Sequence, residues 1–90
     1  MPEGSKIAIS KIVFDILKPH IPPLVDFVTE IASVSGLEKV DATIVEVDAD
    51  TDTVKLVVEG NDINLEKLKE VIKKTGAVIH SIDQVVAVKR

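Results

Sequence analysis

The chain contains no cysteine, tryptophan or tyrosine, and its only aromatic residues are Phe14 and Phe27. Without cysteine it can form no disulfide framework, no thiolate nucleophile and no zinc-thiolate site. With so few aromatic residues it lacks the side chains on which single-stranded nucleic acid stacks its bases. The hydrophobic core must therefore be built from valine, isoleucine and leucine.

The chain also lacks an excess of basic residues, and it lacks long apolar runs. The net charge of -4 argues against a protein that binds the phosphate backbone of nucleic acid. No apolar run approaches the ~20 residues of a membrane span, and residues 1–6 lack the apolar segment of a signal peptide. We therefore expect a cytoplasmic protein without nucleic-acid or membrane partners. Residues 1–5 indicate a flexible tail, and residues 6–90 a single small domain.

Hydrophobic residues make up 46% of the chain, and their periodicity changes along it. Alternating patterns predict strands, and apolar residues spaced three and four apart predict helices. Ile7 and Ile9 are out of phase with the first strand, so that strand either contains a bulge near Ser10 or starts at Lys11. The predicted elements are a strand over 11–17, a helix over 23–34, strands over 40–47 and 54–59, a helix over 64–75 and a strand over 77–88.

The order of these elements, β-α-β-β-α-β, predicts an α+β domain with the ferredoxin-like arrangement. In this fold two right-handed crossovers produce an antiparallel sheet with the strand order 4-1-3-2, and both helices cover one face. The ends of the first and second strands then lie beside the starts of the third and fourth. We therefore expect Asp15, Lys18, His20, the acidic hairpin at 48–53 and His80 to lie at the same end of the sheet.

Three strings in the chain resemble a known family. They are Phe-Asp-Ile-Leu-Lys-Pro-His from Phe14 to His20, Glu-Gly-Asn-Asp from Glu59 to Asp62, and Ile-His-Ser-Ile-Asp from Ile79 to Asp83. Together they resemble a small archaeal family catalogued as domain of unknown function number 211, and the resemblance covers nearly the whole chain. It implies a ferredoxin-like fold and ring-shaped oligomers. It implies no activity, cofactor or site residue.

Lys18, His20 and His80 are the candidate ligand-binding residues, because the predicted topology gathers them at one end. A carboxylate beside a histidine raises the pKa of the imidazole and orients its ring, so Asp15, His20 and His80 could act as acid-base groups in an enzyme. Two histidines and one carboxylate could also bind a transition metal. The structural alternative is that Lys18 is solvated and that His80 is partly buried, with its ring bonded to the backbone.

The hairpin is rich in carboxylates, with the spacing of an EF-hand loop that ends at Glu59. Thr53 stands where that loop requires glycine, which argues against an EF-hand. A looser site for calcium or magnesium, completed by carbonyls of a neighbouring subunit, remains open, and so does a solvated acidic turn that keeps an edge hairpin soluble. The residues assigned to this metal site are Asp15, Glu46, Asp48 and Asp50.

The face of the sheet opposite the helices carries aliphatic residues, and exposed aliphatic surface on a small domain marks an interface. These residues are Val13, Leu17, Val45, Val47, Val57 and one set of valines in the last strand. We therefore expect a homo-oligomer that assembles through the open sheet face and the edge strands. The predicted function is regulatory or assembly-related binding of a small ligand or a divalent ion, and the alternative is an oligomeric enzyme with a subunit-boundary site.

Overall fold

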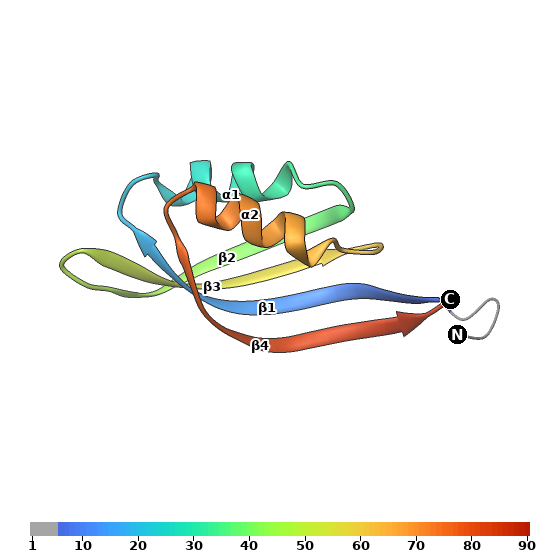
Figure 1. Cartoon of the computed structure of the whole chain (residues 1–90). Helices are drawn as coiled ribbons and strands as arrows, with labels where there is room; N and C mark the ends of the chain where they lie inside the picture. The colour runs from blue at the N-terminus through green and yellow to red at the C-terminus, as the bar shows by residue number, and fades with distance from the viewer. Residues whose placement is uncertain (1–5) are drawn as a thin grey trace.

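The elements follow one another in the predicted order, β-α-β-β-α-β, within residues 6–90, which the computed structural model describes (Figure 1). The predicted tail at residues 1–5 lies outside the described residues. The first and second strands start earlier than predicted, and the hairpin turn is only three residues long. The elements are β1 (Ile7–Pro19), α1 (Leu24–Ala32), β2 (Leu37–Val47), β3 (Thr51–Gly60), α2 (Leu65–Lys74) and β4 (Val78–Lys89).

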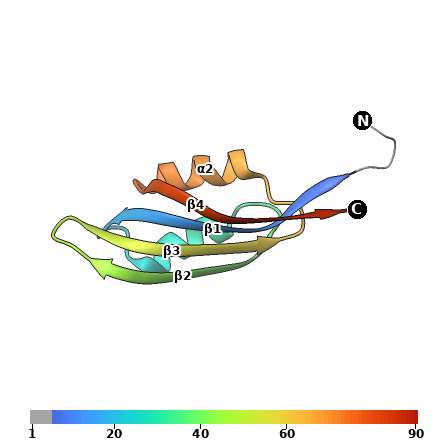
Figure 2. The same cartoon turned by 90° about the horizontal axis from the view of Figure 1, so that it is seen from below.

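The strands form one antiparallel sheet in the order β2-β3-β1-β4, which confirms the predicted ferredoxin-like topology. Both helices lie on the same face of the sheet, and the opposite face is open (Figures 1 and 2). The hairpin between β2 and β3 extends past the helices at one end of the molecule. The paired ends of β1 and β4 extend at the other end. The molecule is consequently elongated, measuring 51 × 22 × 17 Å.

The core lies between the sheet and the two helices. Alternate residues of β1 and β3 point toward the helices, and each helix turns one apolar stripe toward the sheet, as the periodicity predicts. Neither helix within residues 6–90 is long and apolar enough to span a membrane. The central core residues, each at most 1% exposed, are Ile12, Phe14, Ile16, Phe27, Ile31, Val54, Leu56, Val58, Leu68 and Ile72.

The predicted ends of α2 are confirmed by their end groups, whereas α1 ends at Ala32, two residues earlier than predicted. The Asn64 side chain accepts a hydrogen bond of 3.0 Å from the Lys67 amide, which satisfies one of the unpaired donors in the first turn of α2. Gly76 follows α2 with a φ of +93°, a conformation that glycine adopts without steric cost. Both ends of α2 are therefore set by local sequence.

Bulges or register shifts occur at five places in the described sheet and change the phase of the strands. The register of β1 against β4 skips Ser10, which confirms the predicted bulge there, and skips Asp83 and His80 in β4. The register of β2 against β3 skips Glu38 and Val45. Each bulge moves the following residues to the other face of the sheet. His80 is consequently exposed. The prediction of a partly buried His80 was wrong.

The Val45 bulge also corrects the predicted position of Val47. Val47 lies opposite Asp52, whose side chain is on the helix side of the sheet, so Val47 is on that side too. It lies in the part of the hairpin that extends past the helices, and it is 66% exposed. The structure therefore removes Val47 from the open face.

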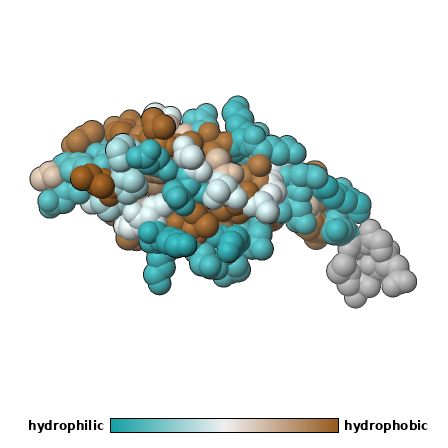
Figure 3. Space-filling view, turned by 90° about the horizontal axis from the view of Figure 1, so that it is seen from above, coloured by the Kyte–Doolittle hydropathy of each residue, from teal (hydrophilic) through white to brown (hydrophobic). Residues whose placement is uncertain are grey.

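Most of the exposed large aliphatic residues lie on the edge strands rather than in the middle of the open face, although Ile7, Ile21 and Val25 are exposed elsewhere. Val13 is only 8% exposed, and Leu17 and Val57 are half-buried among their neighbours. Hydrophobic surface also shows between hydrophilic side chains on the helix side, including at the hairpin end (Figure 3). The exposed aliphatic residues of the edge strands are Ile44, Val45 and Val47 in β2, and Val78, Ile82, Val85 and Val88 in β4.

Candidate functional site

The most densely bonded polar cluster lies where β1 ends and β3 begins. The antiparallel register of these strands places Lys18 directly opposite Asp52. Both residues are on the helix side of the sheet, in phase with the core residues Ile16 and Val54. Lys18 is 1% exposed and Asp52 is 7% exposed. Charged residues are rarely buried to this extent unless they are paired.

The Lys18 ammonium group is satisfied by the loop that follows it. Its Nζ donates hydrogen bonds of 2.7 Å to the Pro19 carbonyl, 2.5 Å to the Pro22 carbonyl and 3.4 Å to the His20 carbonyl. The loop needs such a donor because proline has no backbone N–H, so its carbonyls have few backbone partners. An ammonium group can donate three hydrogen bonds, which matches these three carbonyls. Lys18 therefore holds the loop between β1 and α1.

The Asp52 carboxylate joins Lys18 to His20. Its Oδ2 lies 3.6 Å from Lys18 Nζ, and its Oδ1 lies 3.0 Å from His20 Nδ1. The other ring nitrogen, His20 Nε2, lies 2.9 Å from the carbonyl oxygen of Ala49 in the hairpin turn. The three side chains therefore connect β1, the following loop, β3 and the hairpin turn. We call this group of Lys18, His20 and Asp52 the KHD cluster.

The cluster favours a positively charged His20. The hydrogen bond to the Ala49 carbonyl is the largest cause and raises the pKa of His20. Desolvation comes second and lowers the pKa, and the hydrogen bond and charge of Asp52 raise it again, so that the net shift is upward. Both ring nitrogens face an acceptor, so neither is free to exchange a proton with a bound substrate in this arrangement. The geometry therefore suits a structural role better than acid-base catalysis.

The other predicted acid-base residues lie elsewhere. Asp15 points to the open face, opposite Lys55 of β3 and Ser81 of β4. His80 is an exposed bulge residue in β4. Among residues 6–90 no hydrogen bond or ion pair joins Asp15, His20 and His80 to one another. The structure brings these residues to the same end of the sheet, as predicted, but does not join them in one site.

The predicted metal ligands are not gathered in the single chain. Glu46 lies opposite Thr53, whereas Asp48 and Asp50 are exposed at the hairpin turn. Across the described part of the chain, no three histidine or carboxylate side chains converge closely enough to hold a metal ion. A divalent ion bound by Asp48 or Asp50 would need further oxygen ligands from a second copy of the chain or from water.

Figure 2 shows the open face of the sheet from below. A hollow of about 400 Å³ lies on this face. Asp15 and Asp83 supply carboxylates and Lys55 supplies an ammonium group, while valine side chains supply apolar surface. The bulges at Val45 and Asp83 lie on either side of it. Bulges change the direction of side chains and are common beside binding sites. The complete lining is Val13, Phe14, Asp15, Val45, Thr53, Lys55 and Asp83.

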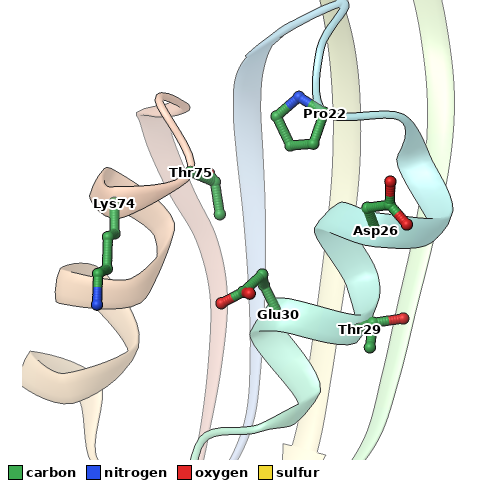
Figure 4. Close-up of a pocket in the computed structure, with 6 residues that line it drawn as sticks. All are labelled: Pro22, Asp26, Thr29, Glu30, Lys74 and Thr75. Atoms are coloured by element: carbon green, nitrogen blue, oxygen red, sulfur yellow. The ribbon is translucent and has the colours of Figure 1, made fainter.

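A second and larger groove, of about 630 Å³, lies between the helices on the opposite side of the molecule (Figure 4). Asp26, Thr29 and Glu30 line it from α1, and Lys74 and Thr75 line it from α2 and its end. Figure 4 shows Glu30 pointing from α1 toward α2. The groove is open and its charged side chains are exposed. No buried side-chain nitrogen or oxygen atom of residues 6–90 lacks a hydrogen-bond partner there or elsewhere.

The fold, the edge strands and the KHD cluster together define the class of protein. It is a small ferredoxin-like domain with aliphatic edge strands and a buried lysine-aspartate pair at one end of its sheet. Residues 10–90 match the model of DUF211, described as an uncharacterized ArCR family, and the chain belongs to this family. It is 43% identical over 82 residues to "Uncharacterized protein MJ0319" of Methanocaldococcus jannaschii. That alignment covers 91% of this chain and 84% of the relative. The resemblance inferred from three short strings is thereby confirmed.

Sequence reasoning missed the pairing of Lys18 with Asp52, although the signal was present. Lys18 continues the alternation of Phe14 and Ile16, and Asp52 precedes Val54 in the same phase. Both positions therefore face the helices, so neither charge could be solvated like a residue on the open face. The expectation that Lys18 is solvated was wrong. Two inward charges of opposite sign at the ends of neighbouring strands indicate a pair.

Proposed function

We propose that this protein is a self-assembling module whose edge strands, β2 and β4, pair with further copies of the chain. The observation that carries the proposal is the concentration of exposed aliphatic residues on these two strands. Val45 and Val47 are 65% and 66% exposed in β2, and Val78 and Val85 are 60% and 52% exposed in β4. Burying such surface against a partner is favourable by ~25 cal/mol per Å².

The backbone of the two edges supports the same proposal. β2 has 11 residues and β4 has 12, and each presents one side without a neighbouring strand. An unpaired edge of this length is a template for a strand of another chain. Because the two edges differ, joining β2 of one copy to β4 of the next is a head-to-tail contact. Repetition of such a contact closes a ring or extends a filament.

The test is sedimentation velocity combined with native mass spectrometry at micromolar concentration. We expect wild-type protein to be oligomeric and the variants Val45→Lys and Val85→Lys to be monomeric with unchanged far-UV circular dichroism. Val25→Lys is the matched control, because Val25 is 74% exposed on α1 and belongs to neither edge. It should leave the mass unchanged.

Mixing the two edge variants distinguishes head-to-tail pairing from symmetrical pairing. Val45→Lys retains an intact β4 edge and Val85→Lys retains an intact β2 edge, so an equimolar mixture should form a heterodimer through the one undamaged interface. A wild-type monomer under these conditions refutes the assembly. A mixture that stays monomeric refutes the head-to-tail pairing of β2 with β4.

The hollow on the open face favours a second candidate function, binding of a small ligand that carries an amine. Two carboxylates, Asp15 and Asp83, flank the hollow, and among residues 6–90 neither forms an ion pair with Lys55. A positively charged group there would be attracted to both carboxylates while apolar atoms contact the valines. The same native mass spectrometry reports any metabolite or ion that stays bound. Loss of that mass in Asp15→Asn would assign the ligand to the hollow.

A further inference from the structure

His20 contacts the tip of the hairpin in a way that depends on its protonation. Nδ1 lies 3.0 Å from Asp52 Oδ1 and Nε2 lies 2.9 Å from the Ala49 carbonyl oxygen. Both partners are acceptors. A neutral imidazole has only one N–H, whereas an imidazolium has two and can donate to both. The observed pair of contacts is therefore complete only when His20 is protonated.

The charged groups around His20 favour this state. Asp52 approaches from β3 and the hairpin turn contributes the carbonyls of Ala49 and Asp48, which all favour the imidazolium. The Lys18 ammonium group of β1 is a like charge and opposes it, but it lies against the same Asp52 carboxylate. The carboxylates of Asp48 and Asp50 lie on the same turn. The His20 side chain is 43% exposed, so its proton can exchange with water. The carbonyl of Ala49, followed by Asp52, raises the pKa of His20 above 6.5.

We infer that His20 is a proton-dependent clamp on the β2–β3 hairpin, which orders the β2 edge when protonated and loosens it when the proton is lost to water. The clamp closes on the turn that joins β2 to β3, next to the exposed residues Val45 and Val47. That part of the hairpin extends past the helices (Figure 1), so it has no helix packed over it. The regulatory half of this inference rests on the proposed assembly through β2.

The neutral ring breaks one contact and keeps the other. The remaining proton stays on Nδ1, where the Asp52 carboxylate is the stronger acceptor. The lone pair of Nε2 then faces the lone pairs of the Ala49 oxygen, and the two atoms repel each other. The hairpin tip is released, while the ring remains beside Asp52.

The direction of the pH dependence follows from the raised pKa. The clamp contributes fully below 6.5, the ordinary pKa of histidine, and its contribution is lost as the pH rises through the higher pKa of His20 in the folded state. Because each clamp releases one proton, the dissociation constant for assembly can rise at most about tenfold per pH unit for each interface. We expect assembly to weaken as the pH rises above 6.5.

The clamp is tested first without assembly, by NMR on the monomeric variant Val85→Lys, whose substitution lies in β4 away from the hairpin. The amide shifts of residues 48–51 and the His20 ring nitrogens should titrate together, with one apparent pKa above 6.5. In His20→Gln, which carries no titrating proton, the hairpin amides should no longer titrate. The matched control is His80→Gln, which removes the other, exposed histidine and should leave the titration unchanged.

Hairpin amides that do not titrate with His20, or that still titrate in His20→Gln, overturn the clamp. Sedimentation of the wild type from about pH 5.5 to 8.5 tests the regulation, with His20→Gln expected to show no pH dependence. A wild type that is monomeric at every pH while its hairpin titrates refutes the proposed assembly and leaves the clamp intact. Assembly that stays constant while the hairpin titrates refutes the regulation alone.

Discussion

Replacing Lys18 by methionine should destabilise the domain more than any substitution of an exposed lysine. Methionine keeps most of the apolar stem of the side chain and removes the ammonium group. The change leaves the Asp52 carboxylate, which is 7% exposed, without its lysine partner. It also deprives the carbonyls of Pro19, His20 and Pro22 of their shared donor.

The magnitude follows from the burial of the pair. Removing one partner of a buried ion pair costs about 3–5 kcal/mol when the other charge is left without compensation. The His20 ring stays 3.0 Å from the Asp52 carboxylate, so we take the lower end of this range. The three carbonyls can regain part of their hydrogen bonding from water at the surface of the loop, so we add no separate cost for them. For a domain of this size each kcal/mol lowers the melting temperature by about 4–8 °C. We therefore expect a loss of about 3 kcal/mol, which corresponds to about 12–24 °C in melting temperature.

The assay is urea unfolding followed by far-UV circular dichroism, since a chain without tryptophan or tyrosine has little intrinsic fluorescence. The measurement is made in the Val85→Lys background, so that dissociation of an oligomer does not contribute to the free energy. Lys55→Met is the matched control, because Lys55 lies on the same sheet but is exposed. A surface change of this kind usually alters stability by less than about 0.5 kcal/mol.

Two results would refute the reasoning. A loss below about 1 kcal/mol in Lys18→Met would show that the ion pair and the loop carbonyls do not depend on the ammonium group. A double-mutant cycle with Asp52→Asn tests the pair itself, for which residues in direct contact show a coupling of about 0.5–3 kcal/mol. If the losses of stability in Lys18→Met and Asp52→Asn simply add in the double variant, the ion pair contributes nothing. The stabilising effect of Lys18 would then come from its hydrogen bonds to the loop alone.

Two further predictions concern other parts of the molecule. In Gly60→Ala the new Cβ would lie 2.0 Å from the Gly36 carbonyl oxygen, so the turn after α1 must move. We expect a loss of about 1–3 kcal/mol in the free energy of unfolding measured in urea. An unchanged midpoint of urea unfolding would contradict this close packing. Calcium should raise the melting temperature of assembled wild-type protein but not of monomeric Val85→Lys, because the single chain between residues 6 and 90 gathers no three metal-binding side chains. Equal shifts in both proteins would contradict a shared site, and no shift in either would remove the calcium or magnesium hypothesis.

Local sequence determined the type and order of the elements. The alternation of Ile12, Phe14 and Ile16 specifies a strand with one buried face, and Leu68 and Ile72 are spaced to share one side of a helix. Asn64 and Gly76 mark the ends of that helix through interactions with residues three or four positions away. Once the order of elements is known, the general rules for strand crossovers give the sheet order as well. These features depend on neighbours in the chain.

The bulges and the KHD cluster were decided by tertiary structure. Bulges at Val45, His80 and Asp83 depend on how one strand registers against another, and each reverses the face of the residues that follow without changing the local pattern of sequence. His20 and Asp52 are 32 positions apart, and only the pairing of β1 with β3 and the path of the hairpin bring them within 3.0 Å. Side-chain direction along one strand is a local property. Contact between strands depends on register, and register is set by the packing of the whole sheet against its helices.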